Sequence, residues 1–115
     1  MKFLHDLDRL NANVAKELLF NIETEVAEGV QLFWSRASDL LHGSGVSLMD
    51  VPAESLSLKR NFFSGLFLYT YVLAGIPRNR RVTYAAINHC LRAMVTGCDN
   101  LLDDEYKPTL LTDYK

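Results

Sequence analysis

Along the first part of the chain, apolar residues recur at steps of three and four positions, the spacing that places side chains on one face of an α-helix. The first series comprises Phe3, Leu7, Leu10, Val14 and Leu18. The second series comprises Ile22, Val26, Val30, Phe33, Ala37 and Leu40. Between them, Asn21 followed by Glu23 and Glu25 is typical of a helix start, because a side-chain cap and early carboxylates suit the positive end of the helix dipole. The pattern predicts two amphipathic helices, one of about five turns from Phe3 and one from Asn21 to about residue 41.

A stretch that contains Gly43, Gly45 and two serines follows, and this composition predicts a turn and a connection. A third helix is predicted over about residues 56–74, and its residues 62–73 are apolar nearly all round. Such a helix lies at the centre of a bundle or in a membrane. The apolar run is shorter than the roughly 20 residues that span a bilayer. We therefore predict a buried central helix and no membrane span, with attachment to a membrane through residues 62–76 as an alternative.

Gly75 and Pro77 predict the end of the third helix, and the arginines that follow lead into a fourth. One narrow face of this fourth helix carries the polar residues His89, Arg92, Thr96, Asp99 and Asp103. The opposite, apolar side comprises Ile87, Cys90, Leu91, Met94, Val95, Cys98, Leu101 and Leu102. We expect the apolar side to pack on the third helix and to bring Arg60 within reach of a cavity that Asp99 and Asp103 face. The predicted fold is all-α, a bundle of about four antiparallel helices in a single domain over residues 1–115.

Composition and charge narrow the function classes. With 115 residues, 49% hydrophobic and 23% charged, and a net charge of −2, the chain fits one globular domain and does not favour nucleic-acid binding. Cys90 and Cys98 lie eight positions apart on one side of a helix, about 12 Å along its axis, too far for a disulfide. We predict buried, packing thiols and, because no secretory apolar segment opens the sequence, a reducing cytoplasm. The residues after Glu105 complete no helical period, so we expect a fragment of a larger helical domain.

Four carboxylates lie within seven positions near the end of the fourth helix: Asp99, Asp103, Asp104 and Glu105. Like charges one helical turn apart repel each other, and a divalent cation would offset this repulsion. Hard carboxylate oxygens suit Mg²⁺, which Asp99 and Asp103 can approach together. Asn100 and Asp104 flank them, where they can hold the waters of the ion. A solvated acidic face is the alternative interpretation.

The stretch Asp99-Asn100-Leu101-Leu102-Asp103-Asp104 resembles the first aspartate-rich motif of class I isoprenoid synthases. In one register it is similar to the DDxxD motif of trans-prenyl diphosphate synthases, with Asn100 in place of an aspartate. In the other register it resembles the DxxxDD motif of squalene and phytoene synthases, whose preceding Leu-Arg-Ala is matched by residues 91–93. Residues 59–60 and 107–109 resemble two further regions of the prenyl diphosphate synthases, so that the resemblance covers roughly residues 58–109.

This resemblance implies the N-terminal part of an all-α isoprenoid synthase-like enzyme, which binds an allylic prenyl diphosphate through Mg²⁺. The second acidic motif of the family is absent from the sequence, so the fragment is expected to bind metal weakly and to be inactive alone. Asp99 and Asp103 would be the catalytic residues. The resemblance implies a metal site of Asp99, Asn100, Asp103 and Asp104, and diphosphate contacts from Lys59, Arg60 and Arg92.

The alternative function is that of a non-catalytic helical bundle that binds a partner helix or assembles with itself. In a fragment, the apolar face of the third helix is partly uncovered, and exposed apolar area favours association. We expect a homo-oligomer, or a contact with the remainder of a longer chain. His89 is interpreted as an interhelical histidine with its hydrogen bonds made, and the alternative is a histidine that faces the cavity.

Overall fold

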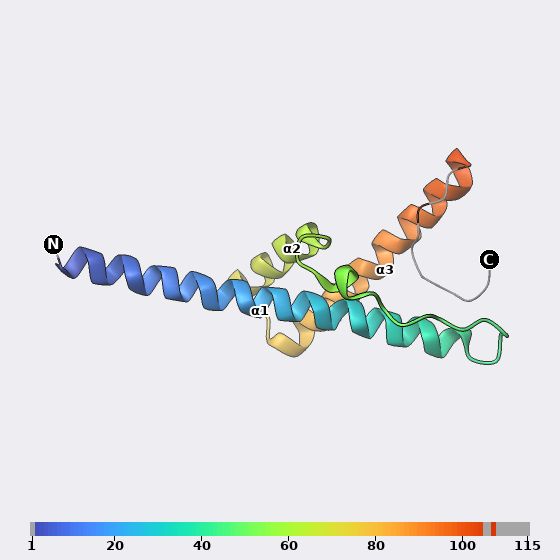
Figure 1. Ribbon diagram of the computed structural model, residues 1–115, viewed down its shortest axis with the longest axis horizontal. Helices are drawn as coiled ribbons and strands as arrows, with labels where there is room; N and C mark the ends of the chain where they lie inside the picture. The colour runs from blue at the N-terminus through green and yellow to red at the C-terminus, as the bar shows by residue number, and fades with distance from the viewer. Residues whose placement is uncertain (1, 105–106, 108–115) are drawn as a thin grey trace.

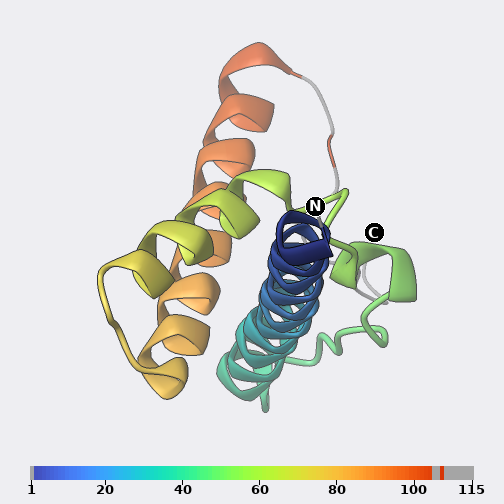
Figure 2. The ribbon, with the colours of Figure 1, turned by 90° about the vertical axis from the view of Figure 1, so that its left-hand side faces the viewer.

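The computed structural model describes residues 2–104 and residue 107, except for the side chains of residues 3–8 and 10. Within this part the protein is all-α, as predicted, and consists of helices α1 (Lys2–Leu41), α2 (Phe62–Leu73) and α3 (Arg78–Asp103) (Figure 1). A short 3-10 helix, η1 (Ala53–Leu56), precedes α2. Viewed along α1, helices α2 and α3 lie on one side of it and η1 lies on the other (Figure 2). None of the described helices has both the length and the apolar character that crossing a membrane requires.

Helix α1 is continuous over 40 residues, so the break predicted at Asn21 is wrong. The described part of the chain accordingly has three α-helices where a bundle of about four was predicted. The segment contains no proline, and Leu18, Ile22 and Val26 continue the spacing of four across the predicted break, so that the two apolar series form one stripe. A helix of this length measures about 60 Å, which accounts for the 64 Å long axis of the molecule.

The connection between α1 and α2 runs back beside α1 (Figure 1). Trp34 Nε1 donates a hydrogen bond to the carbonyl oxygen of Met49 at 2.8 Å and fastens this segment to α1. Helix α2 begins at Phe62 rather than near residue 56, because the residues before it form a turn around Asn61. The buried Asn61 side chain donates from Nδ2 to the carbonyl oxygens of Ser55 and Ser57, both at 2.8 Å.

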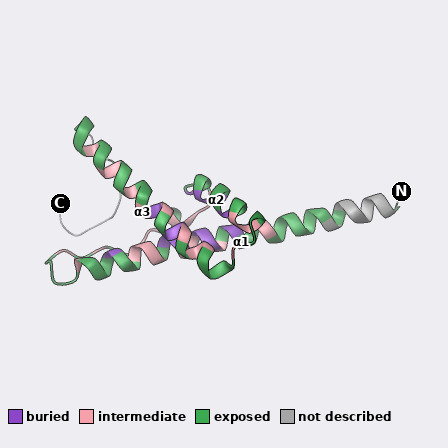
Figure 3. Cartoon of the chain, turned by 180° about the vertical axis from the view of Figure 1, so that it is seen from behind, coloured by how far each residue is buried: buried purple, intermediate pink, exposed green. Residues whose placement is uncertain are grey.

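The core is small and lies near the middle of α1, where the three helices meet (Figure 3). Its buried apolar cluster consists of Ile22, Val26, Leu68 and Ala85. Gly29 of α1 packs directly against Ala85 of α3, and small residues at this crossing let the two helix backbones approach each other. The N-terminal half of α1 and the C-terminal half of α3 extend away from this crossing (Figures 1 and 3).

Helix α3 ends at Asp103, close to the predicted end. Asp104 follows in the left-handed conformation, with φ of 52°, and its backbone N–H donates to the carbonyl oxygen of Asn100. The Asn100 side chain donates from Nδ2 to the carbonyl oxygen of Lys107 at 2.9 Å and accepts at Oδ1 from the Lys107 N–H at 3.0 Å.

Candidate functional site

The acidic end of α3 points into solvent. Asp99, Asp103 and Asp104 are exposed, and Glu105 lies outside the described residues. The amide of Asn100 is bonded to the backbone of Lys107, so the structure gives it a role in ending the helix. Among the described residues, no three His, Cys, Asp or Glu side chains gather closely enough to hold a metal ion. The binding of Mg²⁺ by Asp99 and Asp103 stays a prediction.

The basic residues of the predicted site lie together where α2 begins beside α3. Arg92 Nη1 donates to the carbonyl oxygen of Arg60 at 3.3 Å and to Asn61 Oδ1 at 3.4 Å. Lys59 is exposed next to Arg60, whose guanidinium lies 3.8 Å from Glu54 Oε1. Asp99 lies seven residues beyond Arg92, about 10 Å along the helix axis. Arg92 thus reaches the backbone of Arg60, the guanidinium of Arg60 lies at Glu54, and Asp99 lies two turns farther along α3 than Arg92.

His89 lies between α3 and α1, as the interhelical interpretation predicts. His89 is 9% exposed, and its ring packs edge to face against the ring of Phe33, with the ring centroids 4.8 Å apart. Nδ1 is buried without a hydrogen-bond partner, so the expectation that its hydrogen bonds are made is wrong for this atom. Burial, and then the charge of Arg92, lower the pKa of His89 to about 4. The histidine is therefore held neutral inside the helix contact.

The apolar side of α3 faces away from the core, which corrects the prediction that it packs on the third helix. The residues of α3 that are buried are Ala85, Ala86 and His89. The outer apolar residues, called the α3 ridge below, are at least half exposed: Ile87, Leu91, Met94, Val95, Leu101 and Leu102. Cys98 lies in this stripe and is exposed, in contrast to the predicted buried thiol, while Cys90 is half-buried. The close contact of Ala85 with Gly29 selects the small-residue face for the core and turns the ridge outward.

Helix α2 is only partly covered, so the prediction of a buried central helix is wrong. Its buried residues are Ser64, Gly65 and Leu68, which form a single stripe toward the core. Phe62, Phe63, Leu66, Phe67, Tyr69 and Leu73 are between 42% and 72% exposed. With 12 residues and neighbours on one side, α2 leaves most of its apolar circumference open.

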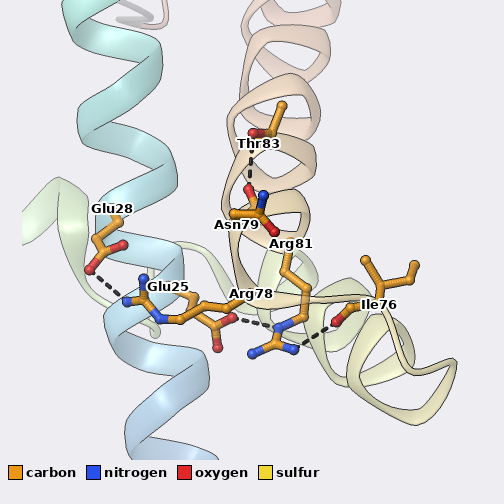
Figure 4. Close-up of polar contacts among 7 residues, drawn as sticks. All are labelled: Glu25, Glu28, Ile76, Arg78, Asn79, Arg81 and Thr83. Atoms are coloured by element: carbon orange, nitrogen blue, oxygen red, sulfur yellow. Dashed lines mark hydrogen bonds and ion pairs between the residues drawn. The ribbon is translucent and has the colours of Figure 1, made fainter.

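A largely buried ion pair links α1 to the start of α3 and was not foreseen from the sequence. Arg81 donates from Nε to Glu25 Oε1 at 2.5 Å and from Nη1 to the carbonyl oxygen of Ile76 at 2.7 Å (Figure 4). Glu25 is fully buried, and its Oε2 has no hydrogen-bond partner. Arg78 makes a similar but exposed pair with Glu28 at 2.7 Å (Figure 4). In the sequence, Glu25 lies between the apolar residues Ile22 and Val26 on the same helix face, and this position could have indicated a buried carboxylate that needs a cation.

Two apolar grooves flank α1. The first, called the α1–α2 groove below, has a volume of about 450 Å³. Its larger lining residues are Leu18, Leu19, Ile22, Leu58, Phe62, Leu66 and Tyr69. The second, of about 350 Å³, lies between α1 and α3 and includes Phe33, Arg36 and Cys90. The α1–α2 groove has no charged residue in its lining, so it suits an apolar helix face.

Comparison of the chain with protein-family models, with curated proteins and with solved structures finds no match.

Proposed function

We propose that this protein is a self-associating helical module that buries its uncovered apolar faces against a second copy of the same chain. The observation that carries the proposal is the amount of surface left open. The Cα radius of gyration is 17.8 Å, where a compact domain of this length has about 13 Å. The chain exposes 8694 Å², where a compact monomer of 13.0 kDa exposes about 6,300 Å².

The surplus, roughly 2,300 Å² per chain, is of the size that a stable dimer covers, since obligate homodimers bury about 1,000–2,500 Å² on each partner. About half of such surface is apolar, and covering apolar surface is the main favourable contribution to most protein association. Losing the freedom of two separate molecules costs about 4–15 kcal/mol, so association requires that much of this apolar surface becomes covered.

The test is sedimentation velocity and thermal unfolding over a wide range of protein concentration. We expect a dimer whose melting temperature rises with concentration, because association stabilises the folded state by mass action. A variant with polar residues on both open surfaces, Leu66→Glu with Leu91→Gln and Val95→Gln, should be a monomer with unchanged helix content. The matched control, Leu66→Met with Leu91→Met and Val95→Ile, should remain a dimer. A wild-type monomer with a cooperative, concentration-independent melt would contradict the proposal.

A second candidate function is the Mg²⁺-dependent binding of an allylic diphosphate, which would make the chain isoprenoid synthase-like. The contact of Arg92 with the backbone of Arg60 supports it, because it places one exposed cation of α3 beside the turn that carries Lys59 and Arg60, and cations attract a diphosphate. The test is titration with Mg²⁺, with and without an allylic diphosphate, of the wild type and of Asp99→Ala/Asp103→Ala. Metal-dependent binding that the double variant loses is expected. Absence of binding, or equal binding by the exposed-site control Asp39→Ala/Asp50→Ala and the double variant, argues against this candidate.

A further inference from the structure

We infer that the two copies pair through antiparallel α1 helices, so that the N-terminal half of α1 in each copy lies in the α1–α2 groove of the other. This inference rests on the proposed self-association and names the surface and the orientation. It assigns the groove an occupant, which is the segment of residues 11–20 from the second copy.

The first support is the isolation of this segment. Residues 11–17 are all exposed, and Val14, Leu19 and Phe20 are 56%, 53% and 66% exposed. The α1–α2 groove begins at Ala15, and the N-terminal end of α1 before it extends from the body without another helix beside it (Figure 1). An isolated helix of about ten residues is marginal in water, because helices in proteins are stabilised mainly by packing of an amphipathic face.

The second support is the position of the groove, which overlaps the second half of the segment, because Ala15, Leu18 and Leu19 line it. Leu18, Leu19 and Ile22 of α1 form one wall, and Leu66 and Tyr69 of α2 form the other. The groove and the segment therefore share one continuous apolar surface. A surface that includes both a ridge and the groove beside it can meet a copy of itself around a two-fold axis.

The third support is the register that such an axis imposes. An axis that passes α1 between residues 18 and 19 sets Val14 of the second copy level with residue 23 of the first, at the Ile22 end of the groove, and sets residues 15–20 of the second copy level with residues 17–22 of the first. The lining has no charged side chain, so an incoming apolar face leaves no ion without solvent or partner. The α3 ridge lies on a helix whose C-terminal half extends away from α1 (Figure 1).

The first experiment uses sedimentation to distinguish a dimer formed through the α1–α2 groove from a dimer formed through the α3 ridge. Leu66→Glu, in the groove, should be a monomer at concentrations where the wild type is a dimer. Leu40→Glu is the matched control, because Leu40 is 86% exposed on the same long helix at its other end, and it should stay a dimer. Leu91→Gln/Val95→Gln on the α3 ridge should also stay a dimer. If the ridge variant dissociates and Leu66→Glu does not, this inference is wrong while self-association stands; a monomeric wild type overturns both.

The second experiment tests orientation without placing a charge in the groove. In a Cys90→Ser/Cys98→Ser background, Leu19→Cys lies beside the proposed axis and should form an intermolecular disulfide on mild oxidation. Leu40→Cys should not, because antiparallel helices carry the two Leu40 positions to opposite ends of the dimer. A parallel pairing would cross-link both variants, and cross-linking at residue 40 would overturn the inference.

Discussion

Gly29 of α1 and Ala85 of α3 lie so close that a Cβ atom added at residue 29 would stand 2.6 Å from the Cβ atom of Ala85 and 3.2 Å from the backbone of residues 85 and 86. Helix propensity favours alanine over glycine by about 1 kcal/mol in a helix interior. The contact with α3 opposes that gain, because the nearest atoms include backbone that cannot rotate away. Gly29 therefore sets the spacing of the two longest helices.

We predict that Gly29→Ala lowers the free energy of unfolding by about 1–2 kcal/mol, since overpacking typically costs about 1–3 kcal/mol and outweighs the helix propensity. Urea denaturation followed by circular dichroism measures it. Gly97→Ala is the control: nothing lies within 4 Å of the added atom, so it should stabilise α3 by up to about 1 kcal/mol. Equal effects of the two substitutions would contradict the importance of the contact.

Arg81→Leu should lower the free energy of unfolding by about 3–5 kcal/mol, because it leaves the buried carboxylate of Glu25 without its cation. The double variant Glu25→Met/Arg81→Leu should recover most of this loss, since it removes the buried charge as well. Arg78→Leu breaks the neighbouring pair, whose side chains are 52% and 41% exposed, and should cost at most about 1 kcal/mol. Chemical denaturation of the four proteins gives the comparison, and a double variant as unstable as Arg81→Leu would refute it.

Stability should fall in mild acid because of His89. Its pKa is about 4 in the folded protein, where burial and Arg92 disfavour the charged ring, and about 6.5 in an unfolded chain. The unfolded state thus binds more protons between about pH 6.5 and about pH 4, so the stabilisation is complete above this window and is lost as the pH falls through it. The loss amounts to at most about 3 kcal/mol. Across this window, the denaturant midpoint should fall with falling pH in the wild type and in the exposed-site control His42→Gln. It should change less with pH in His89→Gln.

Asn61→Ala should cost about 1–3 kcal/mol, because it removes the buried amide that satisfies the carbonyl oxygens of Ser55 and Ser57. Asn21→Ala is the control, and it also tests whether α1 is continuous at this position. In a continuous α1 the exposed Asn21 caps nothing, so the substitution should be neutral or slightly stabilising, whereas loss of a helix cap costs about 1 kcal/mol. Thermal unfolding distinguishes the two outcomes.

Local chemistry foretold most element ends and the all-α fold. Gly43 and Gly45 adopt positive φ after α1, and Gly75 does so after α2, as their roles as helix stops require. The predicted break at Asn21 failed because a cap-like residue ends no helix unless a breaker or a competing contact accompanies it. Periodicity also showed that α3 has an apolar side without showing what covers that side. The answer depended on the Gly29–Ala85 crossing, which joins residues far apart in the sequence.

The roles predicted for the candidate site residues stay predictions. Arg92 donates to the carbonyl oxygen of Arg60 and to the amide oxygen of Asn61, a contact that depends on the turn before α2. Asp99 and Asp103 lie farther along the same helix in solvent, and their predicted metal role is a matter for titration. The buried Glu25–Arg81 pair was missed, since a carboxylate on an apolar stripe does not reveal which of several distant cations it meets.

The same pair constrains the order in which the protein forms on the ribosome. Glu25 and Arg81 are separated by 56 positions in the chain. At synthesis rates of about 5–20 residues per second, roughly 3–11 s pass between the appearance of the carboxylate and that of its cation. Throughout this interval α3 is not yet available to cover Val26 and Gly29, so the face of α1 that later packs in the core stays exposed. The nascent chain is consequently most exposed to premature contacts before residue 81 is made, and its tertiary folding begins late.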